Sequence, residues 1–186
     1  VIINLFIYHF FGSYSVLTNL IFIAAMFLIL HCFLDATQSI SKNKKFEYPR
    51  IISHLGFGLL VLFIGVNHQY SLEVDFNLKV GENKKVNNYE IYFENTKIEQ
   101  NKNYQSVIGN FKLIDLNRSR IQYLYPEIRI YSDPKTLTYE AAIKSKISSD
   151  LYLTMSNVSR SEYYNIKFQT KPFMTWIWVS AFIVAL

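Results

Sequence analysis

Two long apolar runs constrain the fold of this chain more than any other feature, because each is long enough to cross the hydrocarbon core of a membrane as a helix. They cover residues 16–34 and about 51–68. Residues 1–11 and 172–186 are also apolar but too short for a full crossing. We therefore expect membrane-spanning helices in the first part of the chain, the start of a further one at Pro172, and a chain that is one piece of a longer protein.

The connector between the two runs, residues 35–50, has more basic than acidic side chains. Its charged residues are Lys42, Lys44, Lys45 and Arg50 against Asp35 and Glu47. By the positive-inside rule, this balance predicts that the connector lies in the cytoplasm. The second run then passes outward, and residues 71–171 are expected on the periplasmic side. Pro49 fits the first position of a helix, where its missing N–H costs no hydrogen bond.

Residues 71–171 have the pattern of β strands. Every second residue from Leu72 to Val80 is apolar, which is the period of a half-buried strand, and Gly81 follows as a turn signal. We expect further strands at 86–93, 107–116, 120–131 with an interruption at Pro126, 150–155 and 163–168, a polar connection at 95–103, and either a helical turn or a short strand at 141–147.

The predicted fold class follows from these two parts. It is a membrane protein with transmembrane α-helices in residues 1–70 and a mainly antiparallel β domain in residues 71–171, built as a small sandwich or open barrel. About a hundred residues are enough for one hydrophobic core, so the β domain can fold outside the membrane.

Composition excludes several classes of function. The net charge of +5 comes from interspersed lysines and arginines, and there is no glycine-rich phosphate loop or basic aromatic stripe, so nucleic acid is not expected as a partner. Cys32 is the only cysteine, so the chain forms no internal disulfide. No histidine follows His68, which leaves the β domain without a base for nucleophilic catalysis. Its carboxylates, among them Glu127, Glu140 and Asp150, are expected to be surface groups or salt bridges rather than a cation site.

His54 is the candidate for chemistry in the second apolar run. No other titratable group follows it in that run until His68, so its imidazole needs a neighbouring helix, water, or a metal or haem iron as partner. At 3.6 residues per turn, Gly58, Val61 and Gly65 lie on the same helix face. They form a smooth strip against which either a second helix or a flat macrocycle could lie, and the residues alone favour neither.

The four histidines fall on two predicted levels of the membrane. His31 and His54 lie near the inner face, and His9 and His68 lie near the outer face, where they are expected to be interfacial. His31 precedes Asp35 by four residues, a spacing at which the carboxylate could fix the histidine tautomer. His31 and His54 are therefore a candidate pair of imidazole ligands.

The order of several short motifs resembles the C-terminal part of the CcmF family of cytochrome c haem lyases, which are relatives of the NrfE-type lyases. The matching motifs are Ser53-His54-Leu55-Gly56, Val80-Gly81-Glu82, Asn103-Tyr104, Leu124-Tyr125-Pro126-Glu127-Ile128-Arg129-Ile130-Tyr131, Glu140-Ala141-Ala142-Ile143, Asp150-Leu151-Tyr152, and Lys171-Pro172-Phe173 with Trp176-Ile177-Trp178. The chain departs from the family pattern at Ile128, where lysine is usual, and at Lys102, where proline is usual.

The resemblance implies an inner-membrane protein that attaches haem to the Cys-x-x-Cys-His motif of an apocytochrome c. Its partners would be a haem chaperone, the subunits that present the apocytochrome, and the apocytochrome itself. It implies that His54 is one axial ligand to the iron of a haem b, with Gly58 in the strip that faces the macrocycle. The second ligand and a tryptophan-rich haem-handling segment lie on earlier helices in the family, and the family assigns its outer β segment no catalytic residue.

The family occurs in the bacterial inner membrane, and some mitochondrial genomes keep the same system, so both membranes fit the resemblance. The alternative function is a non-catalytic, membrane-anchored β interaction module in which His54 only joins helices. A transporter fragment would require paired polar residues at the middle of a span, and Asn19 alone is present there.

Overall fold

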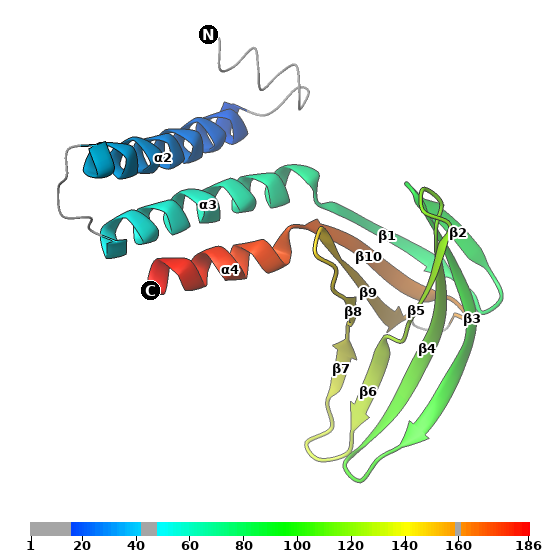
Figure 1. Cartoon of the computed structure of the whole chain (residues 1–186). Helices are drawn as coiled ribbons and strands as arrows, with labels where there is room; N and C mark the ends of the chain where they lie inside the picture. The colour runs from blue at the N-terminus through cyan, green and yellow to red at the C-terminus, as the bar shows by residue number, and fades with distance from the viewer. Residues whose placement is uncertain (1–15, 42–47, 159–160) are drawn as a thin grey trace. The chain divides into compact units, whose positions relative to one another are not determined.

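The computed structural model describes residues 16–41, 48–158 and 161–186 (Figure 1), so His9 and the apolar stretch 1–11 lie outside the described residues. The described elements are α2 (Val16–Ser41), α3 (Tyr48–Tyr70), β1 (Leu72–Leu78), β2 (Asn83–Val86), β3 (Tyr89–Gln100), β4 (Tyr104–Asp115), β5 (Arg120–Leu124), β6 (Glu127–Tyr131), β7 (Leu137–Glu140), β8 (Ala142–Lys144), β9 (Ser149–Asn157), β10 (Tyr164–Pro172) and α4 (Met174–Ala185).

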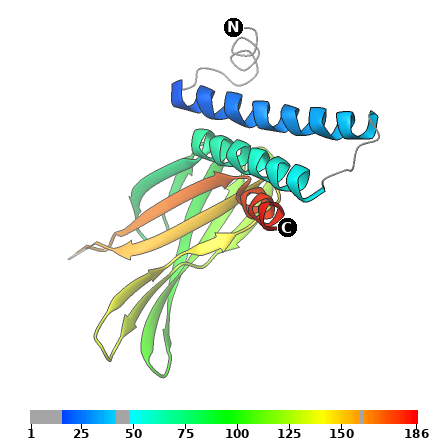
Figure 2. The ribbon, with the colours of Figure 1, turned by 90° about the vertical axis from the view of Figure 1, so that its left-hand side faces the viewer.

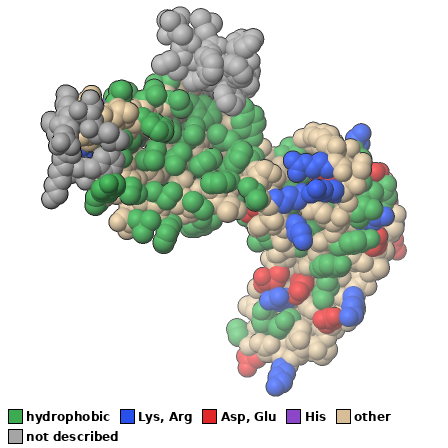
Figure 3. Space-filling model, viewed as in Figure 1, with side chains coloured by type: hydrophobic (Ala, Val, Ile, Leu, Met, Phe, Trp, Pro, Cys, Tyr) green, Lys and Arg blue, Asp and Glu red, His purple; other side chains and the backbone are tan. Residues whose placement is uncertain are grey.

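The chain divides into two compact units. The helical unit consists of the residues up to Ser71 together with Lys146–Ser149 and Lys171–Leu186. The β unit consists of Leu72–Ser145 and Asp150–Thr170. Hydrophobic side chains cover the visible face of the helices, whereas lysine, arginine, aspartate and glutamate are scattered over the β unit (Figure 3).

Two described helices are long and apolar enough to cross a membrane, and they contain the two predicted runs. Helix α2 continues to Ser41, beyond the predicted limit of the run at Leu34, because the following residues include no glycine or proline that would end it. Helix α3 begins at Tyr48 and has Pro49 in its first turn, as the sequence predicts. Helix α4 is a shorter apolar helix of 12 residues.

Helix α3 packs against the other two described helices, α2 and α4, through its glycines. A Cβ atom at Gly56 would lie 2.8 Å from Ile183 of α4, whereas one at Gly58 would lie 3.0 Å from Ile29 of α2 and one at Gly65 would lie 2.9 Å from Ile21 of α2. Small residues let helix backbones approach closely inside a membrane. The three glycines are therefore the reason that α3 can lie between α2 and α4.

The β unit is an antiparallel sandwich of two sheets, which can be followed in Figure 2. One sheet has the strand order β1-β10-β9-β8, and the other has the order β2-β3-β4-β6-β7 with β5 paired to β4. Both sheets contribute to one core, whose fully buried side chains are Ile91, Phe93, Phe111, Leu113, Leu151, Leu153, Met155, Ile166 and Phe168. The rings of Phe93 and Phe111 stack at 4.3 Å in this core. The predicted alternation and the predicted sandwich are confirmed.

The polar stretch 95–103 is predicted to be a connection, and this prediction is wrong for residues 95–100 and right for residues 101–103, which connect β3 to β4. Residues 95–100 form the end of β3, which pairs with β4 from Asn95 opposite Asn110 to Gln100 opposite Gln105, after a bulge next to Phe93. We call this outer part of β3 and the part of β4 that pairs with it the β3–β4 arm. Backbone hydrogen bonds between the two strands hold the arm together, although most of its β3 side chains are exposed. Alternation of apolar residues, which identified the other strands, is absent where neither face of a strand is buried.

Two other predictions concern short segments of the β unit, residues 141–147 and the interruption at Pro126. The stretch 141–147 contains the short strand β8 and no helix. Pro126 separates β5 from β6, which pair with successive parts of the same strand, β4. The Pro126 carbonyl oxygen accepts a hydrogen bond of 2.9 Å from the Gly109 N–H, so the predicted interruption is confirmed.

Candidate functional site

His54 lies on the second turn of α3, and its ring is exposed rather than packed into the helix contact. Its Nδ1 lies 2.7 Å from the carbonyl oxygen of Arg50, one helical turn earlier. A carbonyl oxygen only accepts hydrogen bonds, so a neutral His54 ring carries its proton on Nδ1 and keeps the lone pair on Nε2. Among the residues that the structure describes, none forms a hydrogen bond with Nε2.

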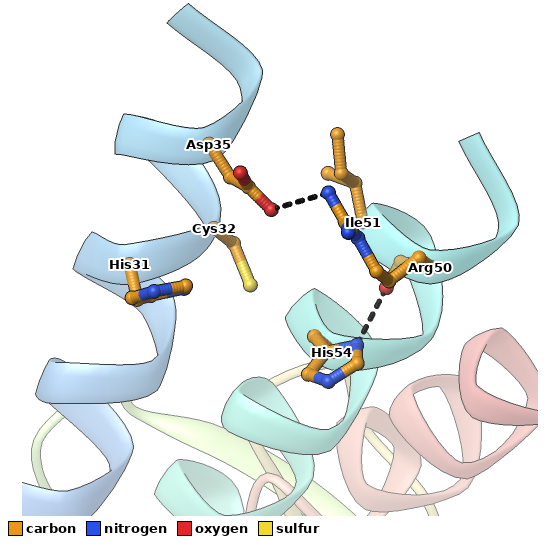
Figure 4. Close-up of a pocket in the computed structure, with 6 residues that line it drawn as sticks. All are labelled: His31, Cys32, Asp35, Arg50, Ile51 and His54. Atoms are coloured by element: carbon orange, nitrogen blue, oxygen red, sulfur yellow. Dashed lines mark hydrogen bonds and ion pairs between the residues drawn. The ribbon is translucent and has the colours of Figure 1, made fainter. Parts of the chain in front are cut away.

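An ion pair joins α2 to α3 beside this histidine. The Arg50 guanidinium lies 3.0 Å from the Asp35 carboxylate, and the two side chains are 51% and 34% exposed (Figure 4). Asp35 was considered above as a partner of His31, and in the structure its carboxylate is bonded to Arg50 instead. Arg50 thus contacts both helices, through its side chain to Asp35 and through its carbonyl oxygen to His54.

His31 and His54 line the same small cavity between α2 and α3. The remaining lining residues are Cys32, Asp35, Arg50 and Ile51 (Figure 4), and the cavity volume is about 120 Å³. Pockets that enclose small molecules are typically ~300–1,000 Å³. A macrocycle does not fit between the two histidines within this cavity. A large flat ligand of His54 would have to lie on the exposed side of the ring.

The strip of small residues next to His54 is covered by a helix. Gly58 and Gly65 are buried, and their nearest neighbours are side chains of α2. Of the two occupants predicted for this strip, the structure has the helix next to Gly58 and Gly65. The helical period predicts that His54, Gly58 and Gly65 share one face of α3. In the structure Gly58 and Gly65 contact α2, and His54 lines the cavity between α2 and α3.

The other sequence candidates have ordinary structural partners. Glu127 lies 2.8 Å from Arg129 and Glu140 lies 3.9 Å from it, and the bond to Glu127 raises the pKa of the Arg129 guanidinium. Asp150 is buried at the start of β9. In the part of the chain that the structure describes, no group of three or more His, Cys, Asp or Glu side chains is placed to bind a metal ion.

The β unit has a second, more open cavity at the end of the β3–β4 arm. Its volume is about 380 Å³, and it is lined by Gln100, Tyr104, Gln105, Ile130, Tyr131 and Lys135 among others. The rings of Tyr104 and Tyr131 lie 5.2 Å apart, and the Arg129 guanidinium lies 5.1 Å from the Tyr104 ring. We call this feature the tyrosine groove.

Comparison with known proteins identifies the family. A family model described as the CcmF C-terminal beta-sandwich matches residues 69–172, which is more than half of the chain. The chain belongs to the CcmF family. The resemblance stated from the sequence motifs is confirmed.

Full-length relatives are much longer than this chain. The cytochrome c-type biogenesis protein CcmF of Haemophilus influenzae is 28% identical over 149 residues, which cover 79% of this chain and 22% of the relative. CcmF of Escherichia coli is 26% identical over 155 residues, which cover 82% of this chain and 24% of the relative. The chain therefore spans about a quarter or less of the length of these two relatives.

A solved structure shows the same fold. The protein named cytochrome c heme lyase CcmF aligns with a TM-score of 0.74 over 93% of this chain and 30% of its own length, with 15% sequence identity. The predicted fold class, a membrane protein with transmembrane helices and an antiparallel β domain, is confirmed for this member of the CcmF family.

The part that Arg50 plays in the site does not appear among the predictions from the sequence. Arg50 precedes His54 by four residues, and that spacing was available as a signal because it places a carbonyl oxygen under the side chain of the later residue. The pairing of Arg50 with Asp35 was not available, since it depends on how α2 and α3 pack.

Proposed function

We propose that this chain is the C-terminal part of a CcmF protein that acts in cytochrome c maturation, with His54 supplying one axial ligand to a haem b in the membrane. The β unit serves as a docking domain on the periplasmic side, for the haem chaperone, the subunits that present the apocytochrome, and apocytochrome c. The membrane is the bacterial inner membrane or, for a chain encoded in a mitochondrial genome, the mitochondrial inner membrane. The proposal assigns no catalytic residue to this chain.

The hydrogen bond from His54 Nδ1 to the Arg50 carbonyl oxygen is the observation that carries the proposal. Histidines that bind a metal through one nitrogen usually donate the other N–H to a carbonyl or carboxylate, which fixes the ring and its tautomer. His54 has this arrangement before any ligand is considered, with Nε2 on an exposed ring. The donor chemistry of the site therefore fits haem iron.

The position of His54 suits an electron-transfer haem. His54 follows Ile51 by three residues, so it lies about 4–5 Å along the helix from the start of the apolar run. A haem bound by His54 and a second imidazole would supply a one-electron redox couple. His54 holds the proton at Nδ1 throughout and contributes only its Nε2 lone pair.

The cavity shared with His31 is too small to enclose a haem, so the second ligand is assigned to another part of the complete protein.

Support for the docking role comes from the tyrosine groove. Paired tyrosines offer large rings with polar tips, which are common at protein interfaces. The basic connector at residues 35–50 supports the orientation, since cytoplasmic loops carry the excess of lysine and arginine.

The alternative function, in which His54 only joins helices, has less support. A histidine that joins helices would bond to the neighbouring helix, whereas Nδ1 of His54 bonds to a carbonyl of its own helix. The contact between α2 and α3 is made by glycines and by the pair of Arg50 and Asp35.

Replacement of His54 by alanine in the complete protein tests the proposal. We expect the purified His54→Ala protein to lose the Soret absorbance of the membrane haem and to support much less cytochrome c formation. The matched control is Arg50→Gln, which keeps the backbone carbonyl and should keep the haem. His31→Ala is a second control that removes an imidazole from the same cavity.

Imidazole rescue separates ligand loss from misfolding. The His54→Gly variant leaves space for free imidazole, and added imidazole should restore part of the Soret band if the side chain only supplies a ligand. Undiminished haem in His54→Ala, together with a normal yield of cytochrome c, would contradict the proposal and favour the interaction module.

A further inference from the structure

The loop between β8 and β9, Lys146–Ser149, belongs to the helical unit rather than to the β unit. Two hydrogen bonds attach it to the start of α4. The Phe173 N–H donates to the Ser148 carbonyl oxygen over 3.1 Å, and the Trp176 Nε1–H donates to the Ile147 carbonyl oxygen over 3.0 Å. Both acceptors are backbone atoms, so the Ile147 side chain takes no part in the attachment.

Ile147 is the most exposed large hydrophobic side chain in the described part of the chain, with 78% of its surface accessible. It lies next to an aromatic cluster in the helical unit. The Trp176 ring stacks on Phe63 with centroids 5.9 Å apart, and Phe63 lies 5.7 Å from the Phe173 ring. The loop is thus held rigidly at a place where it presents an apolar tip to its surroundings.

Helix α3 indicates how far along the membrane normal the loop lies. The Asn67 side-chain amide donates to the Pro172 carbonyl oxygen over 2.6 Å, which fixes the level at which the chain turns into α4. Asn67 follows Ile51 by sixteen residues, or about 24 Å along a helix, so it lies near the far edge of a hydrocarbon core of ~30 Å. The loop and Trp176 are therefore at the interface between lipid and water, where tryptophan is enriched.

The charges beside the tip fit lipid. Lys146 directly precedes Ile147, and Lys144 lies two residues earlier. A lysine with a long apolar stem can place its ammonium group among phosphates while the neighbouring apolar side chain enters the acyl region. An exposed isoleucine, a tryptophan with a satisfied indole N–H, and the exposed Lys144 three residues before Ile147 together match the chemistry of a membrane interface.

We propose that Lys146–Ser149 is an interfacial membrane anchor, with the Ile147 side chain inserted between the lipid headgroups and the acyl chains of the outer leaflet. The anchor is the loop that connects the antiparallel strands β8 and β9. The proposal rests on the membrane-spanning helices and is independent of the assignment of His54.

Site-directed spin labelling of the full-length protein tests the anchor. Ile147→Cys is labelled in a background with no other reactive cysteine and reconstituted in vesicles of phosphatidylcholine and phosphatidylglycerol. Ile98→Cys is the matched control, because Ile98 is also a highly exposed isoleucine, 64% accessible, but lies on β3 in the β unit. Collision with oxygen, which concentrates in lipid, is compared with collision with a water-soluble nickel chelate.

We expect the ratio of oxygen to nickel collisions to be several-fold higher at position 147 than at position 98. An equal ratio at the two positions would show that Ile147 faces water and would overturn the proposal. Low collision with both reagents at position 147 would show that another part of the protein covers the loop, and would also overturn it. Because the loop is held by backbone atoms, the cysteine variant should keep the native tryptophan fluorescence, which checks that the site is intact.

Discussion

Arg50 performs two separable tasks beside His54. Its carbonyl oxygen accepts the His54 Nδ1 proton, and its guanidinium pairs with Asp35. The first task belongs to the backbone, so almost any residue at position 50 would perform it. The second is an exposed ion pair, which typically contributes ~0.2–1 kcal/mol to stability. The Arg50 side chain is therefore a small contribution to helix packing rather than a requirement for the tautomer of His54.

Tyr89 gives the β unit a predictable response to alkaline pH. Its ring packs edge-on against Phe168, and burial raises its pKa above the ordinary value, with the Asp115 charge adding to the shift and Arg118 opposing it. A phenol whose pKa is higher in the folded state stabilises the fold fully below the unfolded value, about 10, and loses that contribution as pH rises toward the folded value. We expect Tyr89→Phe to flatten the loss of thermal stability in this range.

The measurement is the midpoint of thermal unfolding of the wild-type and Tyr89→Phe chains between about pH 9 and pH 11.5. Tyr123→Phe is the control, since Tyr123 is exposed on β5 and its removal should leave the slope unchanged. Parallel curves for the wild type and Tyr89→Phe would contradict the assignment of the alkaline response to Tyr89.

The sequence predicts the identity of the candidate site residue but little of its surroundings. His54 could be found because an isolated titratable residue in an apolar run requires a partner. The partners themselves are a backbone atom and a side-chain pair between helices, and neither changes the pattern of the sequence. The face that carries Gly58 could be predicted from the helical period, whereas its occupant, Ile29 of α2, depends on tertiary packing.

The glycines of α3 provide a graded test at the level of whole elements. At Gly56, a Cβ atom would lie 2.8 Å from the Ile183 side chain and 2.9 Å from the backbone nitrogen of Val184, so α4 itself would have to move. At Gly58 the nearest atom is the Cγ1 of Ile29, at 3.0 Å, which belongs to a side chain that can shift. Overpacking costs ~1–3 kcal/mol, and alanine gains ~1 kcal/mol over glycine in helix propensity.

These opposing terms predict different outcomes for the two substitutions. Gly56→Ala should lower the free energy of unfolding of the helical unit by about 1–2 kcal/mol, whereas Gly58→Ala should be close to neutral and should keep any bound haem. Circular dichroism during thermal unfolding in detergent measures both. Greater stability of Gly56→Ala than of the wild type would show that α4 does not pack against Gly56 as described.

The elements differ in how well local pattern predicted them. The apolar runs and the alternation of Leu72, Val74 and Phe76 identify α2, α3 and β1 because burial on one or all faces is visible in the order of the residues. The outer part of β3, from Asn95 to Gln100, has mostly exposed side chains, and its pairing with the adjacent strand β4 makes it a strand. Strand order in the two sheets, such as β1 beside β10, is a matter of long-range contact.

At the scale of the whole molecule, the two units have different surfaces for different surroundings. The helices present exposed apolar side chains such as Leu20, Phe27 and Phe57, which suit lipid. The β unit encloses its own core and carries mixed charges outside, including the pair of Lys79 and Glu162 at 2.7 Å, which lowers the pKa of the Glu162 carboxyl. The proposed role requires these surfaces to face lipid and the periplasm respectively.

Cysteine labelling in intact cells tests orientation and docking together, in a background with no other reactive cysteine. Gln105→Cys places the label in the tyrosine groove. Asn117→Cys places it in the exposed turn after the opposite end of β4, and Gln38→Cys places it near the end of α2 that is proposed to lie in the cytoplasm. A membrane-impermeant maleimide added to spheroplasts should reach positions 105 and 117 and should reach position 38 only after permeabilisation, because the positive-inside rule predicts that the basic connector is cytoplasmic. A bulky maleimide at position 105 should also reduce cytochrome c formation several-fold, since it fills the groove between Tyr104 and Tyr131, whereas the same group at position 117 should not. Labelling of position 38 from outside would reverse the orientation, and equal cytochrome c yields from proteins labelled at 105 and 117 would remove the groove from the docking surface.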